Sequence, residues 1–307
     1  MPRIAYVNGH YVPHAEAAVH IEDRGYQFAD AVYEVWGVID GALTDFDGHL
    51  TRLARSLREL EIRKPISDSA LTAILHRLVE INRIHHGLVY LQISRGVARR
   101  DHVFPKPAVP SSIVITARST PATAAEARAR HGISIITQPD HRWARRDIKT
   151  VSLLPNVLAK QAAHKNGAAE CWMIDPDGMI TEGAAANAWI INAEGVLVTR
   201  PATNDILNGI TRRIIISLAQ REGLATEERA FSRDEALHAR EAFITSATSY
   251  LTPVVQIDGQ SIGNGHPGSL SLRLRDSYVA TAKERSHRSS TRQPVWLVAR
   301  QSKRLQN

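Results

Sequence analysis

One lysine, Lys149, lies in an apolar-flanked Asp-Ile-Lys-Thr segment directly before a predicted helix. The helical pattern begins at Leu153-Leu154-Pro155, and a proline suits a first helical turn because its missing N–H would be unpaired there anyway. Lys149 is therefore predicted in an extended segment or turn, where apolar neighbours can remove its charge by desolvation and make its amine a nucleophile. A lysine considered alone is more often an ordinary exposed side chain, so its assignment depends on the rest of the chain.

Two short loops and one arginine are candidates for binding a phosphate. Gly209-Ile210-Thr211 precedes a predicted helix, whose N-terminus would offer backbone N–H groups and a hydroxyl to an anion. Ser246-Ala247-Thr248 is a second loop of small and hydroxyl residues, and Arg52 could pair with phosphate charge. Each feature alone is more often an ordinary helix cap or surface residue. The chain has no Walker-type or Gly-x-Gly-x-x-Gly sequence, so the phosphate need not belong to a nucleotide.

Glu182 is a candidate partner for an aromatic ring nitrogen. It opens a run of small residues that includes Ala184-Ala185-Ala186, which would leave room for a flat ligand. A carboxylate beside a pyridine nitrogen keeps that nitrogen protonated and makes the ring an electron sink. The alternative interpretation is an exposed glutamate in a turn, which is the usual location of this residue type.

Tyr33, Arg100 and His102 could bind a carboxylate, because a guanidinium can donate two parallel hydrogen bonds and the other two side chains can add donors. Without further context, the stretch Arg99-Arg100-Asp101-His102 is better interpreted as a solvated basic loop. No metal site is expected: Lys160 and His164 lie one helical turn apart without carboxylate or thiolate partners. His49 is expected to be structural or to support Arg52 rather than to act in catalysis.

The elements that must position these residues alternate between strands and helices. Residues 4–12 predict a hairpin with its turn at Asn8-Gly9, and 31–39 predict a strand followed by an Asp40-Gly41 turn. Apolar residues at helical spacing predict helices from Gly48 onward and over 68–85. In the second half, the pattern predicts a hairpin around Asp175-Pro176-Asp177-Gly178 and a helix over roughly 211–222 that is capped by Gly223.

The stretch 120–132 is predicted to be a linker, which places a domain boundary near residue 120. Residues 1–119 would form a small N-terminal α/β domain, 120–284 a large C-terminal domain, and 285–307 a basic, disordered tail. A chain of 307 residues can bury two modest cores.

Composition narrows the class of protein. The formal charge of +7 is mostly due to six Lys and Arg residues in 285–307, and removing them leaves about +1, so nucleic-acid binding by the folded part is not expected. The N-terminal sequence does not look like a secretory signal, and no segment is apolar for long enough to span a membrane. The single cysteine, Cys171, allows no disulfide within the chain, which fits a reducing cytoplasm.

The chain also carries an ordered set of motifs: Lys149, Glu182-x-Ala-x-x-Asn187, Leu197-x-Thr199 and Leu207-x-Gly209-Ile210-x-Arg212. This set resembles the signature of the fold-type IV pyridoxal-phosphate aminotransferases. The resemblance covers roughly residues 4–280 and is greatest to the D-amino acid aminotransferases, on the phrases EDRGYQFADAVYEV, RWARRDIK, LLPNVLAKQAAH and ILNGITR and on the Arg100/His102 pair. It implies a two-domain α+β fold with the active site between the domains, pyridoxal 5′-phosphate as cofactor, and a homodimer.

The resemblance also implies roles for the candidate residues. Lys149 would bind the cofactor through a Schiff base and then move a proton on the substrate, while Glu182 would lie against the pyridine nitrogen. Tyr33, Arg100 and His102 would hold the substrate carboxylate, the latter two donated by the other subunit. The remaining cofactor contacts would come from Arg52, Leu207 behind the ring, Gly209, Ile210, Thr211, Ser246, Ala247 and Thr248.

The expected reaction is amino transfer from D-alanine-like D-amino acids to 2-oxo acids such as 2-oxoglutarate or pyruvate. A branched-chain L-amino acid aminotransferase of the same fold is the nearest alternative, followed by an aminodeoxychorismate lyase or an amine transaminase. From a different class, a basic nucleic-acid-binding protein would lose binding on removal of 285–307, whereas an aminotransferase would keep its activity. Some positions depart from the D-enzyme pattern: alanines stand at 184–186 where serines are usual, Ala247 replaces a threonine, Gly37 replaces a common lysine, and Trp189 fills a Phe or Tyr position.

Overall fold

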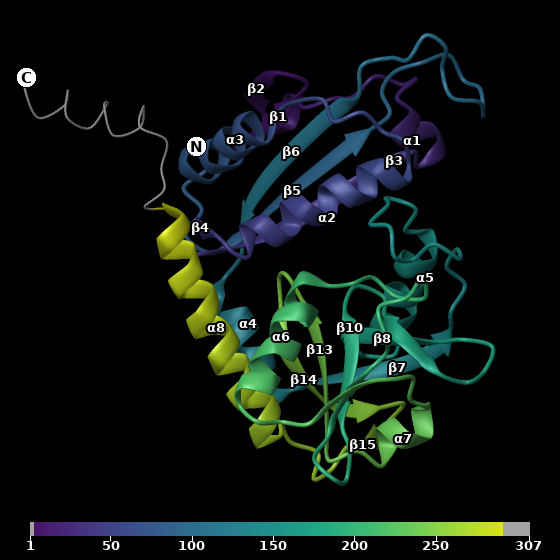
Figure 1. Ribbon diagram of the computed structural model, residues 1–307, viewed down its shortest axis with the longest axis vertical. Coiled ribbons are helices and arrows are strands. Elements are labelled where there is room, and N and C mark those ends of the chain that lie inside the picture. The colour runs from purple at the N-terminus through teal and green to yellow at the C-terminus, as the bar shows by residue number, and fades with distance from the viewer. Residues whose placement is uncertain (1–2, 291–307) are drawn as a thin grey trace, which may run out of the picture.

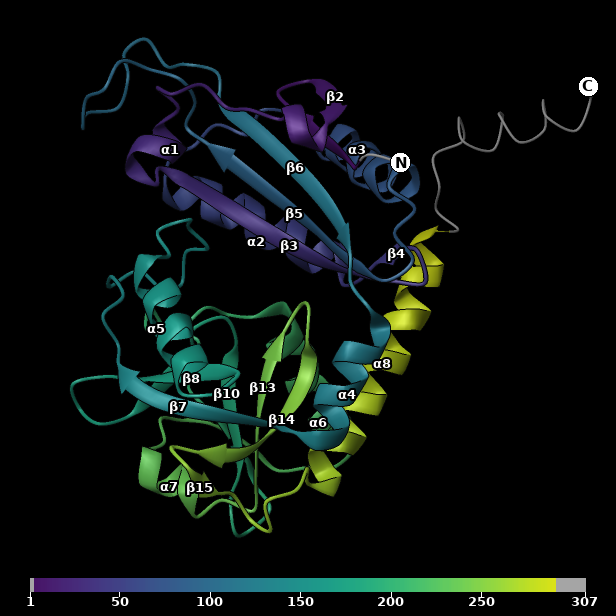
Figure 2. The ribbon, with the colours of Figure 1, turned by 180° about the vertical axis from the view of Figure 1, so that it is seen from behind.

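The computed structural model describes residues 3–290, with side chains described through residue 284. Two sheets, each with its own helices, lie one above the other in Figure 1. The long C-terminal helix α8 (Ser269–Ser290) runs along one side of the molecule, from the lower sheet to the upper one, and Figure 2 shows the same arrangement from behind. Among the described residues, no helix has the length and apolar character needed to cross a membrane.

The N-terminal sheet has six strands, and every neighbouring pair is antiparallel. Helices α2 (Phe46–Glu59) and α3 (Asp68–Ile81) share one buried core with this sheet, because their apolar residues recur at helical spacing on a single face. A 3₁₀ turn (His14–Glu16) and a short helix, α1 (Arg24–Phe28), precede strand β3 (Ala31–Ile39). The strands in spatial order are β2 (His10–Pro13), β1 (Ile4–Val7), β6 (Ser112–Ser119), β5 (Gly87–Ser94), β3 (Ala31–Ile39) and β4 (Ala42–Leu43).

The C-terminal sheet is mixed, with parallel pairs where β7 joins β14 and β8 and where β11 joins β12. Its helices are α4 (Ala122–His131), α5 (Leu154–Lys165), α6 (Ile210–Arg221), α7 (Arg233–Leu237) and α8. The strands in spatial order are β12 (Thr226–Glu228), β11 (Leu197–Thr199), β10 (Asn187–Ile191), β13 (Glu241–Ser246), β14 (Tyr250–Ile257), β7 (Ile133–Pro139), β8 (Glu170–Ile174) and β9 (Ile180–Gly183), with β15 (Gln260–Ser261) paired to β14.

The predicted hairpins are confirmed. Asn8 and Gly9 join β1 to β2 with positive φ angles of 45° and 102°, and Asp40 and Gly41 join β3 to β4 in the same way. Gly178 closes the turn between β8 and β9 by donating its N–H to the carbonyl of Asp175 at 3.0 Å. The helix predicted over 211–222 is α6, which begins one residue earlier, at Ile210.

Two expectations about the chain were wrong, and one helix was not predicted. The stretch 120–132 is not a linker: alanine, glutamate and arginine favour helix, and residues 122–131 form α4, which ends before Gly132. Helix α8 was missed, although Leu270, Leu274, Tyr278 and Ala282 recur at helical spacing and are packed against the core. The tail does not begin at residue 285, because α8 continues to Ser290; residues 291–307 lie outside the described part of the chain.

Candidate active site

A cavity of about 250 Å³ lies between the two sheets and collects most of the predicted site residues. Its walls come from strand β3, helix α2, the segment between β7 and α5, the β9–β10 region, the start of α6 and the loop between β13 and β14. The predicted residues that line it are Tyr33, Arg52, Lys149, Glu182, Leu207, Gly209, Ile210, Thr211, Ser246, Ala247 and Thr248.

Lys149 lies on the irregular segment that joins β7 to α5, and that segment is attached to β3. The Tyr33 N–H donates to the Lys149 carbonyl at 3.0 Å, and the Val151 N–H donates to the Ala31 carbonyl at 3.1 Å. The Lys149 ammonium lies 4.2 Å from the centre of the Tyr33 ring. Backbone pairing on both sides therefore fixes where the amine enters the cavity.

Glu182, on β9, is buried and surrounded by donors. The Asn187 amide donates to its Oε2 at 2.9 Å, the Leu207 N–H lies 3.2 Å from both carboxylate oxygens, and Arg142 Nη1 pairs with Oε1. Burial raises the pKa of the Glu182 carboxyl, and the charge and hydrogen bond of Arg142 act in the opposite direction. The Glu182 side chain is therefore fixed by its donors, in a position where a ring N–H in the cavity could donate to it.

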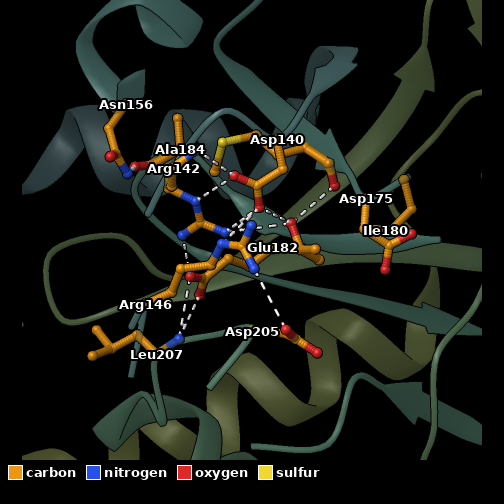
Figure 3. Close-up of polar contacts among 12 residues, drawn as sticks. Asp140, Arg142, Arg146, Asn156, Asp175, Ile180, Glu182, Ala184, Asp205 and Leu207 are labelled. Carbon is orange, nitrogen blue, oxygen red and sulfur yellow. Dashed lines mark hydrogen bonds and ion pairs between the residues drawn. The ribbon is translucent and has the colours of Figure 1, made fainter. Parts of the chain in front are cut away.

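A line of alternating charges runs from Glu182 through Arg142, Asp140 and Arg146 to Asp205, whose side chain is 42% exposed (Figure 3). Arg142 is held on its far side by Asp140, with Nε 3.0 Å from Oδ1 and Nη2 2.7 Å from Oδ2. Arg146 continues the line, with its Nε 3.3 Å from Asp140 Oδ2 and its Nη1 3.4 Å from Asp205 Oδ1. Each charge in this line has a neighbour of opposite sign. The ion pair with Arg142 therefore helps to fix the Glu182 carboxylate, in addition to the hydrogen bonds from Asn187 and Leu207.

Arg52, on α2, is held by a fully buried carboxylate. Its Nε lies 2.7 Å from Glu34 Oε1 and its Nη2 lies 2.8 Å from Glu34 Oε2, while Nη1 donates to the Asn208 carbonyl at 3.4 Å. His49 Nδ1 is also 2.8 Å from Glu34 Oε2. Burial alone would raise the pKa of Glu34, but the charge and hydrogen bonds of Arg52, with those of His49, lower it from 4.5 to about 2. Nε and Nη2 of Arg52 are therefore committed to Glu34, while Nη1 carries two N–H groups and can donate to an anion as well as to the Asn208 carbonyl.

We expect Glu34→Gln to lower the free energy of unfolding at neutral pH and to make that free energy less sensitive to acid. A carboxyl whose folded pKa is depressed stabilises the fold above its unfolded pKa, and that contribution is lost as pH falls from about 4.5 towards 2. At neutral pH the loss of the buried charge should cost about 3 kcal/mol. Urea unfolding measured at neutral and at acid pH would test this, with the exposed Glu16→Gln as control; equal acid sensitivity of wild type and Glu34→Gln would contradict the account.

The part of the cavity wall at the start of α6, which we call the phosphate end, has the features of an anion site. Gly209 precedes α6 and Thr211 lies in its first turn. The Thr211 hydroxyl is buried without a well-formed hydrogen bond among the described residues; the Tyr278 hydroxyl lies beside it but donates to Asp45 Oδ2 at 2.5 Å. A Cβ at position 209 would lie 2.2 Å from Asn187 Oδ1, so the backbone can approach the cavity there only as glycine.

The three residues predicted to bind a carboxylate are not brought together within one chain. Tyr33 lines the cavity, but Arg100 and His102 do not. Their exposed loop is attached to α1 instead: the Arg100 guanidinium lies 4.6 Å from the centre of the Phe28 ring, and the Arg24 guanidinium donates to the His102 carbonyl at 3.4 Å.

Sequence reasoning missed Glu34 and Arg142 as parts of the site. Glu34 could have been found as the one charged residue in the apolar stretch Ala31–Ile39, because a charge in a buried strand needs a partner. Arg142 gave no such signal, since it lies among Arg145 and Arg146 in one basic run. His49 fits its expected supporting role, because it contacts Glu34 beside Arg52.

The chain is similar in sequence to known proteins. Residues 31–257 match the sequence model of the family described as "Amino-transferase class IV". A D-alanine aminotransferase of Bacillus licheniformis is 42% identical over 288 residues, which are 94% of this chain and 98% of that protein. A D-alanine aminotransferase of Listeria monocytogenes serotype 4b (strain F2365) is 40% identical over 274 residues, covering 89% of this chain and 94% of that protein.

Solved structures show the same fold. A branched-chain amino acid aminotransferase of T.th., solved with pyridoxamine 5′-phosphate, superposes with a TM-score of 0.84 at 26% identity and covers 93% of this chain and 95% of that one. The Escherichia coli branched-chain enzyme superposes with a TM-score of 0.85 at 23% identity, covering 92% of this chain and 95% of that one. At that identity the second likeness shows the fold alone.

Proposed function

The chain belongs to the class IV aminotransferases, and from that premise we propose that it is a pyridoxal-phosphate-dependent D-amino acid aminotransferase. It transfers the amino group of D-alanine-like D-amino acids to 2-oxo acids such as 2-oxoglutarate or pyruvate. The observation that supports this most strongly is that Lys149, Glu182 and the start of α6 line one cavity of about 250 Å³. The D-alanine aminotransferases among its relatives support the choice of donor.

The residues present fit the cofactor. The Thr211 hydroxyl, the N-terminus of α6 and the Ser246–Thr248 loop would hold the phosphate, with Arg52 Nη1 beside them. Glu182 would accept the pyridine N–H, and Leu207 would line the wall next to it. Pyridoxal phosphate, when bound, supplies an electron sink that stabilises negative charge on the substrate Cα.

The remaining chemistry is done by side chains of the protein. Lys149 is the only lysine among the described residues that line the cavity, so its amine takes the proton from the substrate Cα and returns it later. Arg142, Asn187 and the Leu207 N–H hold the Glu182 carboxylate where it would face the ring, and the charge of Arg142 opposes its protonation. The network behind Arg142 prevents the carboxylate from turning away.

We also infer that the enzyme works as a homodimer in which Arg100 and His102 of one subunit complete the site of the other. Three observations support this: the pair lies outside its own cavity, its loop is exposed, and α5 carries an exposed apolar face next to the cavity. On that face Leu154, Val157 and Leu158 are 69%, 58% and 62% exposed, which a lone soluble subunit rarely shows. Tyr33 would be the contribution of the subunit itself to the carboxylate trap.

If the subunits share their sites in this way, two inactive variants should restore each other's activity when they form a mixed dimer. Lys149→Ala and Arg100→Leu should each be nearly inactive as homodimers, but after unfolding and refolding as a 1:1 mixture about a quarter of the sites should combine both native residues. Activity near a quarter of wild type would support the shared site. Activity no higher than that of the separate variants would show that Arg100 acts within its own subunit or not at all.

The branched-chain L-amino acid aminotransferase is the second candidate, favoured by the structural likeness to the branched-chain enzyme solved with pyridoxamine 5′-phosphate. The two are separated by mixing the purified enzyme with one donor at a time and following the absorbance of the cofactor. We expect D-alanine to react much faster than L-leucine. The reverse order would assign the chain to the branched-chain type.

Two further proposals concern the chain as a whole. We place the domain boundary near residue 120, where β6 ends at Ser119 and α4 begins at Ala122. We also place the enzyme in the cytoplasm, because its single cysteine, Cys171, is buried and forms no disulfide.

A further inference from the structure

Helix α8 is hydrogen-bonded to the loop between β13 and β14, on the side of the loop that faces away from the cavity. Arg275 is 2% exposed, and its Nη1 donates to the Leu251 carbonyl at 2.6 Å and to the Ser249 carbonyl at 3.2 Å. Its Nη2 pairs with Glu126 of α4 at 3.2 Å. Ser249 is the last residue before β14 and directly follows Ser246–Thr248, which line the cavity, whereas Leu251 lies in the first part of β14.

The residue between those carbonyls, Tyr250, has an unfavourable backbone conformation. Its φ is +59°, in the left-handed region that a bulky side chain rarely adopts, so the conformation persists only where neighbouring contacts enforce it. Arg275 supplies such contacts on both sides of Tyr250, and the Tyr250 ring packs against that of Tyr278 at 5.7 Å. Across the loop, a Cβ on Gly37 would lie 2.7 Å from the Ala247 carbonyl, so the loop is confined between β3 and α8.

Tyr278 connects the same helix to the other two walls of the phosphate end. Its ring is buried, and its hydroxyl donates to Asp45 Oδ2 at 2.5 Å and lies beside the Thr211 hydroxyl. Asp45 is the residue that precedes α2, which carries Arg52, and Thr211 is in the first turn of α6. One turn of α8 thus contacts the loop, the start of α2 and the start of α6.

We propose that Arg275 and Tyr278 are positioning residues for the cofactor phosphate, although neither lines the cavity. The inference rests on the proposed function. By fixing the strained loop and the starts of α2 and α6, they preset the distance between the groups that would receive the phosphate. Groups that are already in position do not have to be ordered when the cofactor binds, and so cost no free energy at that step. Removing the contacts of Arg275 or Tyr278 should therefore weaken the affinity for the phosphate specifically.

The test compares pyridoxal phosphate with pyridoxal, which lacks the phosphate, as ligands of the full-length chain freed of cofactor. We expect Arg275→Met to raise the dissociation constant of pyridoxal phosphate roughly tenfold, the effect of losing one charge-assisted hydrogen bond, and to leave that of pyridoxal unchanged. Arg273→Met is the matched control, because Arg273 lies on the same helix but is 53% exposed and pairs with Glu222. It should bind both ligands as wild type does.

Tyr278→Phe provides a second test should Arg275→Met fail to fold, because it removes one hydroxyl and keeps the ring packed on Tyr250. We expect pyridoxal phosphate to bind about threefold more weakly and pyridoxal equally well. Equal weakening of both ligands, or no change in either, would overturn the positioning role while leaving the proposed function intact. A wild-type chain that binds neither ligand would overturn the proposed function and this inference together.

Discussion

Replacing Lys149 by alanine is expected to lower kcat/KM for amino transfer from D-alanine at least about 10⁴-fold. Lys149 is the only lysine that lines the cavity among residues 3–290, and its place is fixed by backbone hydrogen bonds to β3. His49 also lines the cavity, but it is committed to Glu34, and burial lowers its pKa. No other described side chain there combines a basic amine with a free approach to the substrate Cα.

The control for this variant is Lys165→Ala, at the exposed end of α5, which should keep wild-type activity. Steady-state rates would be measured for both variants, with and without added methylamine. A free amine can take the Cα proton in place of the missing side chain, so methylamine should restore part of the rate of Lys149→Ala. A Lys149→Ala enzyme with a rate within tenfold of wild type would mean that another group moves the proton.

Replacing Glu182 by glutamine is expected to lower kcat about 10²- to 10³-fold, which is the usual cost of losing one preorganised electrostatic partner. The amide keeps the shape of the side chain but carries no charge to hold a proton on a ring nitrogen. It also leaves the Arg142 guanidinium buried with Asp140 as its remaining ion-pair partner. We therefore expect a lower melting temperature as well as a lower rate.

The rate of the Glu182→Gln variant should be compared with that of Glu235→Gln, which removes a carboxylate paired with an arginine, Arg229, far from the cavity walls. Glu235→Gln should change kcat little. If Glu182→Gln lost stability but kept its kcat, Glu182 would be a structural partner of Arg142 and not the partner of the cofactor ring.

Patterns that depend on neighbouring residues were predictable from the sequence. The Asn8-Gly9 and Asp40-Gly41 turns followed from residue types that tolerate positive φ, and the position of Lys149 before α5 followed from the proline in the first turn. Helix α4 was predicted as a linker, although its alanine, glutamate and arginine residues favour helix.

Features that depend on residues far apart in the chain were not predictable. Glu34 and Arg52 are separated by eighteen positions, and Arg142 and Glu182 by forty, so no local sequence pattern predicts either ion pair. Arg275 meets the loop after β13 only because α8 folds back along both sheets. The place that we propose for Arg100 and His102 requires a second subunit, so it depends on contacts between chains and not on a pattern within one chain.

We propose above all that Lys149 holds the aldehyde end of the cofactor in the cavity that Glu182 also lines. The most direct measurement is to reduce the purified, cofactor-loaded enzyme with borohydride, digest it and locate the added mass by mass spectrometry. The account predicts one modified peptide, with the pyridoxyl group on Lys149. A label on another lysine, or no covalent label in an enzyme that still transfers amino groups, would contradict it.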